Sequence, residues 1–166
     1  GEKADIKRIS YDFSRRGYCM IITDVHEDHA SLTDKYAEII GDMRSTAEYF
    51  GAKRLIDVPQ GAFYEAVPQI RKTAGDRAVL RAFHFYADND RVPQQVAALR
   101  SGDFDTFLQL VTASGDSSWE YLQNVIPAGY KEHQEMGVTI AAAKHYLQGK
   151  GAVRVHGGGF AGTALA

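Results

Sequence analysis

The chain has 166 residues, of which 45% are hydrophobic and 24% are charged, a balance typical of a globular protein. The 19 lysine and arginine residues and the 21 aspartate and glutamate residues leave a formal net charge of −2 without any basic block, which argues against binding to nucleic acid or to an anionic membrane. The length suits one domain with its own core, so we expect residues 1–166 to form a single domain.

The first two predicted elements are strands. Residues 9–13 alternate apolar and polar side chains, the period-2 pattern of a half-buried strand. Residues 18–23 form a nearly continuous apolar run, typical of a more central strand, and residues 14–17 indicate the turn between them. We expect these two strands to pair antiparallel.

A helix is predicted next. Ser31, followed by Asp34, resembles a capping box at its start, and Gly51 is a plausible residue at its end. Pro59 and Pro68 interrupt the following stretch, which predicts short helical turns there rather than one long helix.

Three further helical segments follow. Asp76 is a predicted N-cap, and Pro93 is expected to end or kink the helix that reaches it. Asp103 opens another helix, which residues 114–118 (S-G-D-S-S) are expected to break. The last helix has one apolar face and stops at Gly149.

Residues 152–155 favour a short strand that runs directly into a glycine-rich segment. Strands near both ends of the chain, with helices between them, predict an α+β domain with an antiparallel sheet packed against helices.

The location of the protein is predicted from its only cysteine and its N-terminus. Cys19 lies in an apolar run and is expected to be a small buried residue. An internal disulfide is impossible with one cysteine, which fits a reducing compartment. The first five residues do not resemble a signal peptide, and no apolar stretch approaches the length of a membrane span. We therefore expect a cytoplasmic protein without a membrane partner.

Residues 157–162 (G-G-G-F-A-G), the glycine loop, are the sharpest motif. Each of its four glycines costs about 0.5–1 kcal/mol relative to alanine in ordered structure, which indicates unusual dihedral angles or a close approach of the backbone. Successive N–H groups there could cradle an anion, whereas the alternative is a simple turn between two strands. The surrounding sequence matches neither a Walker A loop nor a dinucleotide-binding fingerprint.

Two histidine-containing segments offer other chemistry. Asp24, His26 and His29 form a D-x-H-x-x-H cluster that could ligate zinc, or could be solvated side chains at a strand end. No fourth ligand is apparent, so we assign no metal site. His84 lies between two phenylalanines and is expected to be hydrogen-bonded and partly buried rather than catalytic.

Residues 154–163 (R-V-H-G-G-G-F-A-G-T) resemble the third signature motif of the galactokinases, T-G-G-G-F-G-G, within the GHMP kinase superfamily. In the same order along the chain, residues 18–36, 81–92 (R-A-F-H to D-N-D-R-V) and 97–107 (A-A-L-R-S-G-D to F) are similar to other galactokinase segments. The resemblance extends from about residue 9 to residue 163.

This resemblance implies the C-terminal domain of a two-domain kinase that transfers phosphate from ATP, with Mg²⁺, to the anomeric hydroxyl of galactose. The family's sugar signature, phosphate-binding loop and catalytic aspartate lie in its N-terminal domain, and this sequence contains none of them. We therefore expect no catalytic residue here, no activity of this chain alone, and an N-terminal domain as its partner.

The resemblance also assigns site residues by position. Tyr36 matches the tyrosine that contacts the sugar in galactokinases. The loop that packs against the phosphate-binding loop is matched by Gly157, Gly158, Gly159, Phe160, Ala161 and Gly162. These residues would supply backbone N–H groups and shape. A side chain at Gly158 or Gly159 would then collide with the neighbouring domain, at little cost to this one.

Three departures from the family pattern bear on the sugar. His156 stands in place of the usual threonine, Ala161 stands in place of a glycine, and residues 37–40 (A-E-I-I) lack the arginine pair that commonly follows the sugar-contacting tyrosine. The alternatives are a GHMP kinase that acts on another small alcohol and, from a different class, a non-catalytic sensor or regulator that keeps the sugar and ATP pockets. A metal-binding module is a more distant alternative.

Overall fold

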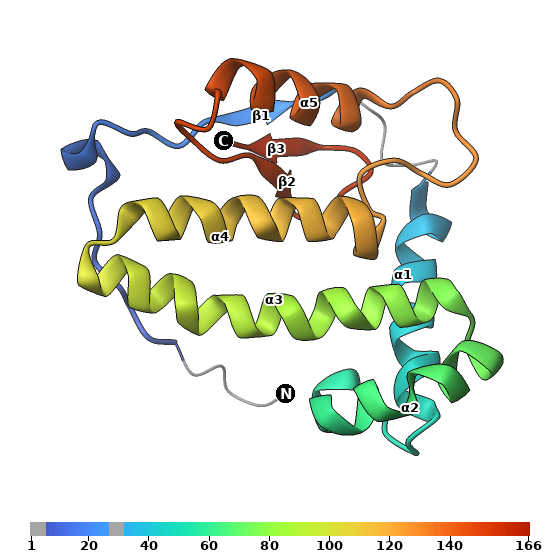
Figure 1. The fold of residues 1–166 in the computed structure, drawn as a ribbon. Coiled ribbons are helices and arrows are strands. Elements are labelled where there is room, and N and C mark those ends of the chain that lie inside the picture. The colour runs from blue at the N-terminus through green and yellow to red at the C-terminus, as the bar shows by residue number, and fades with distance from the viewer. Residues whose placement is uncertain (1–5, 27–31) are drawn as a thin grey trace.

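The computed structural model describes residues 6–26 and 32–166. Figure 1 shows two long helices, α3 (Asp76–Ser101) and α4 (Phe104–Ser117), running antiparallel through the middle of the molecule. The sheet and α5 (Glu135–Leu147) lie on the α4 side, whereas α1 (Thr33–Glu48) and α2 (Gln60–Thr73) pack against α3. The shorter elements are the 3-10 helices η1 (Phe13–Arg16) and η3 (Leu55–Asp57), the π-helix η4 (Ser118–Leu122), and the strands β1 (Ile22–Asp24), β2 (Arg154–His156) and β3 (Thr163–Leu165). The predicted α+β fold, with an antiparallel sheet packed against helices, is confirmed.

The sheet joins the two ends of the described chain. Its order is β1-β3-β2, with both pairs antiparallel, so that Ala164 in the central strand lies opposite Thr23 on one side and Val155 on the other. The predicted pairing of residues 9–13 with residues 18–23 is therefore wrong.

The alternating side chains of residues 9–13 cover the start of α4 instead of a sheet face. The rings of Tyr11 and Phe13 lie 5.9 and 5.7 Å, centroid to centroid, from the ring of Phe104. The prediction that Cys19 is buried is also wrong, because Cys19 lies in the exposed run that leads into β1, an edge strand. A period-2 pattern indicates that one side of a segment is apolar, but it does not indicate which element of the fold packs against that side.

Two helix ends that depend on local hydrogen bonds were predicted correctly, whereas Asp76, the predicted N-cap of α3, is the first residue of that helix and Gly75 is its N-cap. Gly51, with φ of 70°, closes α1: its N–H donates to the Glu48 carbonyl at 2.9 Å, and the Ala52 N–H donates to Ala47 at 3.1 Å. Asp103 caps α4, and its carboxylate accepts a hydrogen bond from the Thr106 N–H at 3.1 Å. Ser31, the predicted start of α1, lies outside the described residues.

The prolines interrupt less than predicted. Pro59 does precede a helix, but Pro68 lies inside α2 and Pro93 inside α3. A proline inside a helix costs about 3 kcal/mol, because it removes one hydrogen bond and crowds the preceding turn. Burial of α2 side chains such as Phe63 and Ile70, both fully buried between α1 and α3, offsets that cost.

The predicted break at residues 114–118 is wrong too, because α4 continues through Ser117 into η4. The hydroxyls of Ser114 and Ser117 bond to side chains of α3, so they join two helices rather than competing with the helix backbone.

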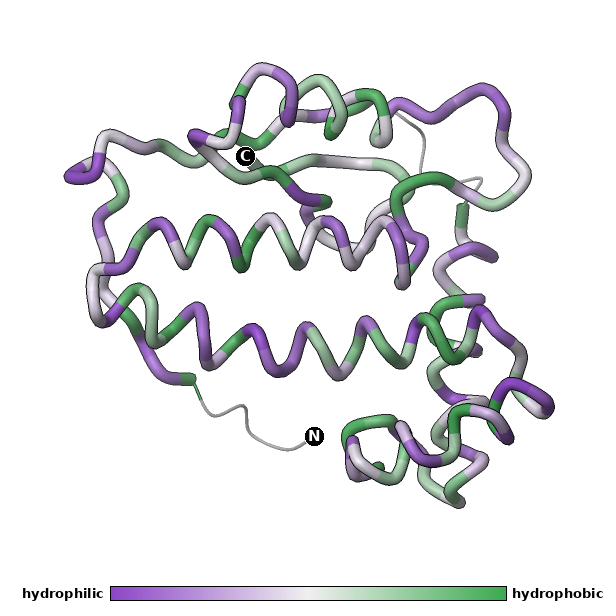
Figure 2. The backbone as a smooth tube through the Cα atoms, viewed as in Figure 1, coloured by the Kyte–Doolittle hydropathy of each residue, from purple (hydrophilic) through white to green (hydrophobic). Residues whose placement is uncertain are grey.

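Apolar side chains gather in three clusters. The largest lies between α1, α2 and α3, the second lies between α5 and the sheet, and a small third one contains Leu32, Phe160 and Ala161 beneath the glycine loop. In Figure 2, α3 and α4 alternate hydrophobic and hydrophilic segments along their length, as expected of amphipathic helices. None of the described helices is long and apolar enough to cross a membrane.

Candidate functional site

The glycine loop, residues 157–162, connects β2 to β3 as the turn of a hairpin (Figure 1). Gly157, Gly159 and Gly162 have φ of 83°, 89° and 88°, values that side-chain-bearing residues rarely adopt, and Phe160 has φ of 58°. The unusual dihedral angles predicted from its composition are confirmed. The loop is a turn between two strands, and the binding of a phosphate group by its N–H groups stays a prediction.

Tyr36 holds the loop from the α1 side. Its hydroxyl donates a hydrogen bond of 2.7 Å to the Gly159 carbonyl, and its ring meets the Phe160 ring edge-on at 5.5 Å between centroids. Phe160 is fully buried, so its ring anchors the loop in the third apolar cluster. The structure thus brings together Tyr36 and the glycine loop, the two assignments made by resemblance, although 123 residues separate Tyr36 from Gly159.

Asn124 holds the loop from the other side. Its side-chain amide donates to the Gly158 carbonyl at 3.0 Å, and its backbone carbonyl accepts from the Phe160 N–H at 2.5 Å. Asn124 is 3% exposed, and its Oδ1 atom has no hydrogen-bond partner among the described residues. Nothing in the local sequence marked this residue as part of the site.

These contacts explain two glycines. A Cβ atom on Gly159 would lie 2.1 Å from the Asn124 carbonyl oxygen, and one on Gly158 would lie 2.9 Å from the Tyr36 ring. The expectation that a side chain at these positions would collide only with a neighbouring domain is therefore wrong. Both positions are crowded within this chain.

The loop's carbonyl groups and its N–H groups differ in whether they have hydrogen-bond partners. The carbonyls of Gly158 and Gly159 accept hydrogen bonds from Asn124 and Tyr36, which fixes the peptide planes. The N–H groups of residues 157–159 have no acceptor within the described part of the chain. Unpaired N–H groups on a fixed backbone could bind an anion or a carbonyl of another segment.

A polar network positions the strand that leads into the loop. The Asp88 carboxylate accepts from the Ser114 hydroxyl at 2.7 Å, and the Arg154 guanidinium donates to the same hydroxyl oxygen at 2.6 Å. Gly115 lets α4 approach closely, since a Cβ there would lie 2.8 Å from the Val153 carbonyl oxygen. α3, α4 and β2 are thus joined at one point.

His84 belongs to the same network. It is 6% exposed, its Nδ1 lies 2.9 Å from the Ser117 hydroxyl, and its Nε2 lies 3.6 Å from the Asp88 carboxylate. Burial lowers the pKa of His84, which favours the neutral ring. The prediction of a hydrogen-bonded histidine is confirmed, with burial more complete than expected.

A cavity of about 440 Å³ opens beside the loop. Its lining includes Tyr36, His84, Asp88, Asn124, Gly157 and Gly158, and is completed largely by apolar side chains of α1 and α3. A mainly apolar cavity with a few convergent polar groups is the usual form of a small-molecule site.

The proposed metal ligands show no such convergence. The His26 Nδ1 lies 3.4 Å from the Asp24 carboxylate, and both side chains are more than half exposed. His29 lies outside the described residues. Within residues 6–26 and 32–166, no three histidine, cysteine, aspartate or glutamate side chains are grouped to hold a metal ion.

Comparison with known proteins identifies galactokinases among the relatives of this chain. No protein-family model matches the chain. The galactokinase of Actinobacillus pleuropneumoniae is 29% identical over 149 residues, which are 90% of this chain and 37% of that protein. The galactokinase of Glaesserella parasuis serovar 5 is 28% identical over 150 residues, with the same coverage. The structure of Lactococcus lactis galactokinase complexed with galactose matches with a TM-score of 0.67 and 22% identity, covering 89% of this chain and 36% of that one.

The chain thus spans about 37% of the length of the curated relatives that it matches. The resemblance to galactokinases predicted from its motifs is confirmed along nine tenths of the chain, and at the level of the fold by the Lactococcus structure.

Proposed function

We propose that this chain, a homologue of the galactokinases over 90% of its length, is the C-terminal domain of an ATP-dependent sugar 1-kinase. Galactose is the proposed substrate, and galactose 1-phosphate and ADP are the proposed products. Residues 1–166 would form one domain and would pack against an N-terminal domain that carries the phosphate-binding loop and the catalytic aspartate. The protein would work in the cytoplasm.

The observation that supports this proposal most strongly is how the glycine loop is held by hydrogen bonds. Its carbonyls are engaged by Tyr36 and Asn124, whereas the N–H groups of residues 157–159 are unpaired within the described residues. In the assembled enzyme these N–H groups would face the phosphate-binding loop or the transferring phosphoryl group. Donors fixed before the reaction need no reorganisation when charge develops, which is how such groups lower a barrier.

Tyr36 is the proposed sugar contact. Its hydroxyl donates to Gly159, and Tyr36 also lines the cavity beside the loop. A sugar bound in that cavity would therefore contact Tyr36 next to the loop. One side chain would then link recognition of the sugar to the position of the loop.

We assign no acid, base or metal ligand for the transfer to the described residues. His84, whose ring borders the cavity, is buried and is favoured in its neutral form by the lowering of its pKa. No described group of side chains is arranged to hold Mg²⁺, so we assign this chain no Mg²⁺ ligand and no step that depends on the ion. ATP and Mg²⁺ would be held by the N-terminal domain.

Residues 37–40 (A-E-I-I) support a second candidate. They lack the family's arginine pair, and Ile40, which lines the cavity with Tyr36, is 61% exposed. A pocket edge that is apolar rather than cationic would favour a GHMP kinase for another small alcohol. A non-catalytic sensor is the third candidate, distinguished by loss of the catalytic aspartate from the N-terminal domain.

The test compares the full-length protein with the 166-residue chain in an assay of ADP release. We expect the full-length protein to phosphorylate galactose and the chain alone to show no activity above a heat-inactivated control. Full-length protein that binds galactose and ATP without turnover would indicate the sensor. Activity of the chain alone would refute the assignment of the chemistry to another domain.

A further inference from the structure

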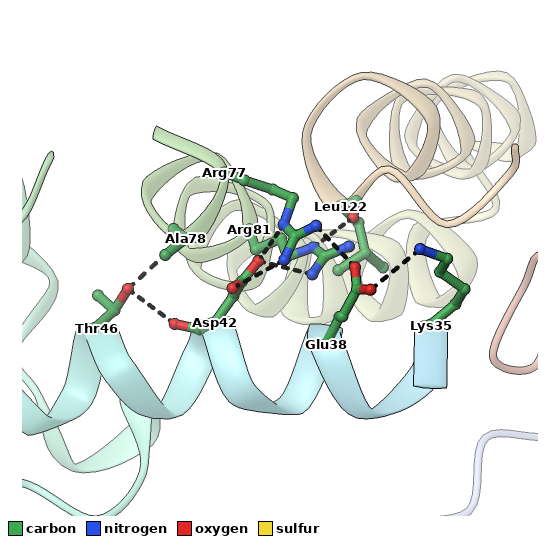
Figure 3. Close-up of polar contacts among 8 residues, drawn as sticks. All are labelled: Lys35, Glu38, Asp42, Thr46, Arg77, Ala78, Arg81 and Leu122. Carbon is green, nitrogen blue, oxygen red and sulfur yellow. Dashed lines mark hydrogen bonds and ion pairs between the residues drawn. The ribbon is translucent and has the colours of Figure 1, made fainter. Parts of the chain in front are cut away.

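Five charged side chains join α1 to α3 near the glycine loop (Figure 3). The Glu38 carboxylate binds the Lys35 ammonium group at 3.1 Å and the Arg77 guanidinium at 2.7 Å. The Asp42 carboxylate binds Arg77 at 2.6 Å and Arg81 at 2.7 Å. Two carboxylates therefore pair with three cations, which leaves this cluster with a net charge of +1.

Arg81 is the most buried member. Its side chain is 3% exposed, and its Nε donates to the Leu122 carbonyl at 3.0 Å. A guanidinium group does not lose its proton in a protein, so burial leaves a fixed positive charge at this position. A buried charge that shares its counter-ion with a second guanidinium is favourably placed to attract another anion.

A cavity of about 200 Å³ opens against this cluster. Lys35, Glu38, Arg77 and Arg81 line its charged part, so that three cations and one carboxylate face the space, and Trp119, Ile126 and Phe160 line its apolar part. The volume lies below the roughly 300–1,000 Å³ of sites for drug-sized ligands. That space suits a molecule of a few heavy atoms.

We propose that this cavity binds a small organic monocarboxylate. Its carboxylate would pair with Arg77, Arg81 and Lys35, and its apolar part would lie against Trp119 and Phe160. The planar fork of a guanidinium matches the two oxygens of a carboxylate. This inference goes beyond the proposed kinase and requires neither a sugar nor ATP.

The charge count selects a monoanion. One negative charge neutralises the cluster's net charge, whereas a dianion would leave uncompensated negative charge beside Glu38 and Asp42. The apolar lining selects an organic acid over an inorganic ion, since a small ion would leave the aromatic walls without contact. Phe160 belongs to the glycine loop, so an occupant of this cavity would touch the loop directly.

The experiment uses the 166-residue chain itself, because Trp119 is its only tryptophan and lines the cavity. Propionate is titrated at constant ionic strength while Trp119 fluorescence is recorded. We expect a saturable change with a millimolar dissociation constant. Propionamide, which has nearly the same shape but no charge, should give none.

Matched variants locate the binding. Arg77→Gln and Lys35→Gln should each weaken propionate binding roughly tenfold or more, about 1.4 kcal/mol per factor of ten. Arg71→Gln is the control, because Arg71 pairs with Asp76 at 2.7 Å and does not line the cavity. Circular dichroism verifies that each variant is folded, and two cavity variants keep the test informative if one fails to fold.

Three outcomes would overturn the proposal. The first is an equal, non-saturating response to propionate and propionamide. The second is propionate binding that is unchanged in both cavity variants. The third is inorganic phosphate binding more tightly than propionate at neutral pH, which would identify a dianion site. Because sugar and ATP are absent, none of these outcomes depends on kinase activity.

Discussion

Gly159→Ala is predicted to lower the free energy of unfolding of this chain by about 2–5 kcal/mol. The backbone at Gly159, with φ of 89°, costs a side-chain-bearing residue about 1–2 kcal/mol. The new Cβ would lie 2.1 Å from the Asn124 carbonyl oxygen, and reaching an ordinary contact of 3.4 Å requires a shift of 1.3 Å. That shift would break the hydrogen bond between the Asn124 carbonyl and the Phe160 N–H, and a buried group left unpaired costs about 1–3 kcal/mol.

Gly157→Ala is the matched control. Gly157 lies in the same loop with φ of 83°, but a Cβ there would meet nothing within 4 Å. It should cost only the dihedral strain of about 1–2 kcal/mol, so the difference between the two variants isolates the contact with Asn124. Urea denaturation of both variants and of the unmodified chain measures that difference.

For a chain of this length, 1 kcal/mol corresponds to roughly 2–4 °C, so the midpoint of thermal unfolding of Gly159→Ala should fall by about 4–20 °C. Equal stabilities of the two alanine variants would show that Asn124 does not crowd Gly159. The close approach of Asn124 to the loop would then have no energetic consequence.

Three further predictions follow from the same geometry. Gly115→Ala should destabilise the chain by about 1–3 kcal/mol, because the new Cβ would contact the backbone that precedes β2. Gly41→Ala, in open space on α1, should stabilise the chain by up to about 1 kcal/mol in the same urea assay. The opposite order of stabilities would contradict the packing of α4 on β2. Tyr36→Phe in the full-length protein should raise the KM for the sugar more than the KM for ATP, and equal changes in steady-state kinetics would indicate a structural role alone. Because burial lowers the pKa of His84, the unfolded chain takes up a proton first as the pH falls below about 6.5. The free energy of unfolding should therefore decrease from pH 7 to pH 5. The variant His84→Gln should reduce that decrease, and an unchanged pH profile in this variant would refute the linkage.

Local chemistry determined which parts of the fold could be predicted. Gly51 and Asp103 were placed correctly because a helix end depends on hydrogen bonds within a few residues. Residues 9–13 and Pro68 were misjudged because their structure depends on partners far along the chain. A pattern of apolar side chains does not reveal whether a strand or a helix end will cover them, and a propensity does not reveal how much burial will offset it.

Some residues of the candidate site could likewise be predicted from the sequence, and others could not. Tyr36 and the glycine loop were predicted from family motifs, not from physical reasoning about the isolated sequence. Asn124 was missed because it lies in an irregular segment after η4, where no periodicity or capping pattern operates. Its importance comes from one close contact with Gly159 across the fold. The charged cluster of α1 and α3 was missed because charges on two separate helices become neighbours only when those helices pack.

The position of β3 has a consequence for how the chain folds during synthesis. β3 is the central strand, and residues 21 and 166 also exchange two backbone hydrogen bonds, of 2.8 and 2.9 Å. A ribosome that has released the chain only as far as residue 162 has therefore exposed both edge strands without the strand that separates them. The helices between them can pack from contacts near in sequence, whereas the sheet must close a loop of about 140 residues. Until then the backbone N–H and C=O groups of β1 would lack their neighbouring strand, and this interval is when the nascent chain would be most prone to aggregate.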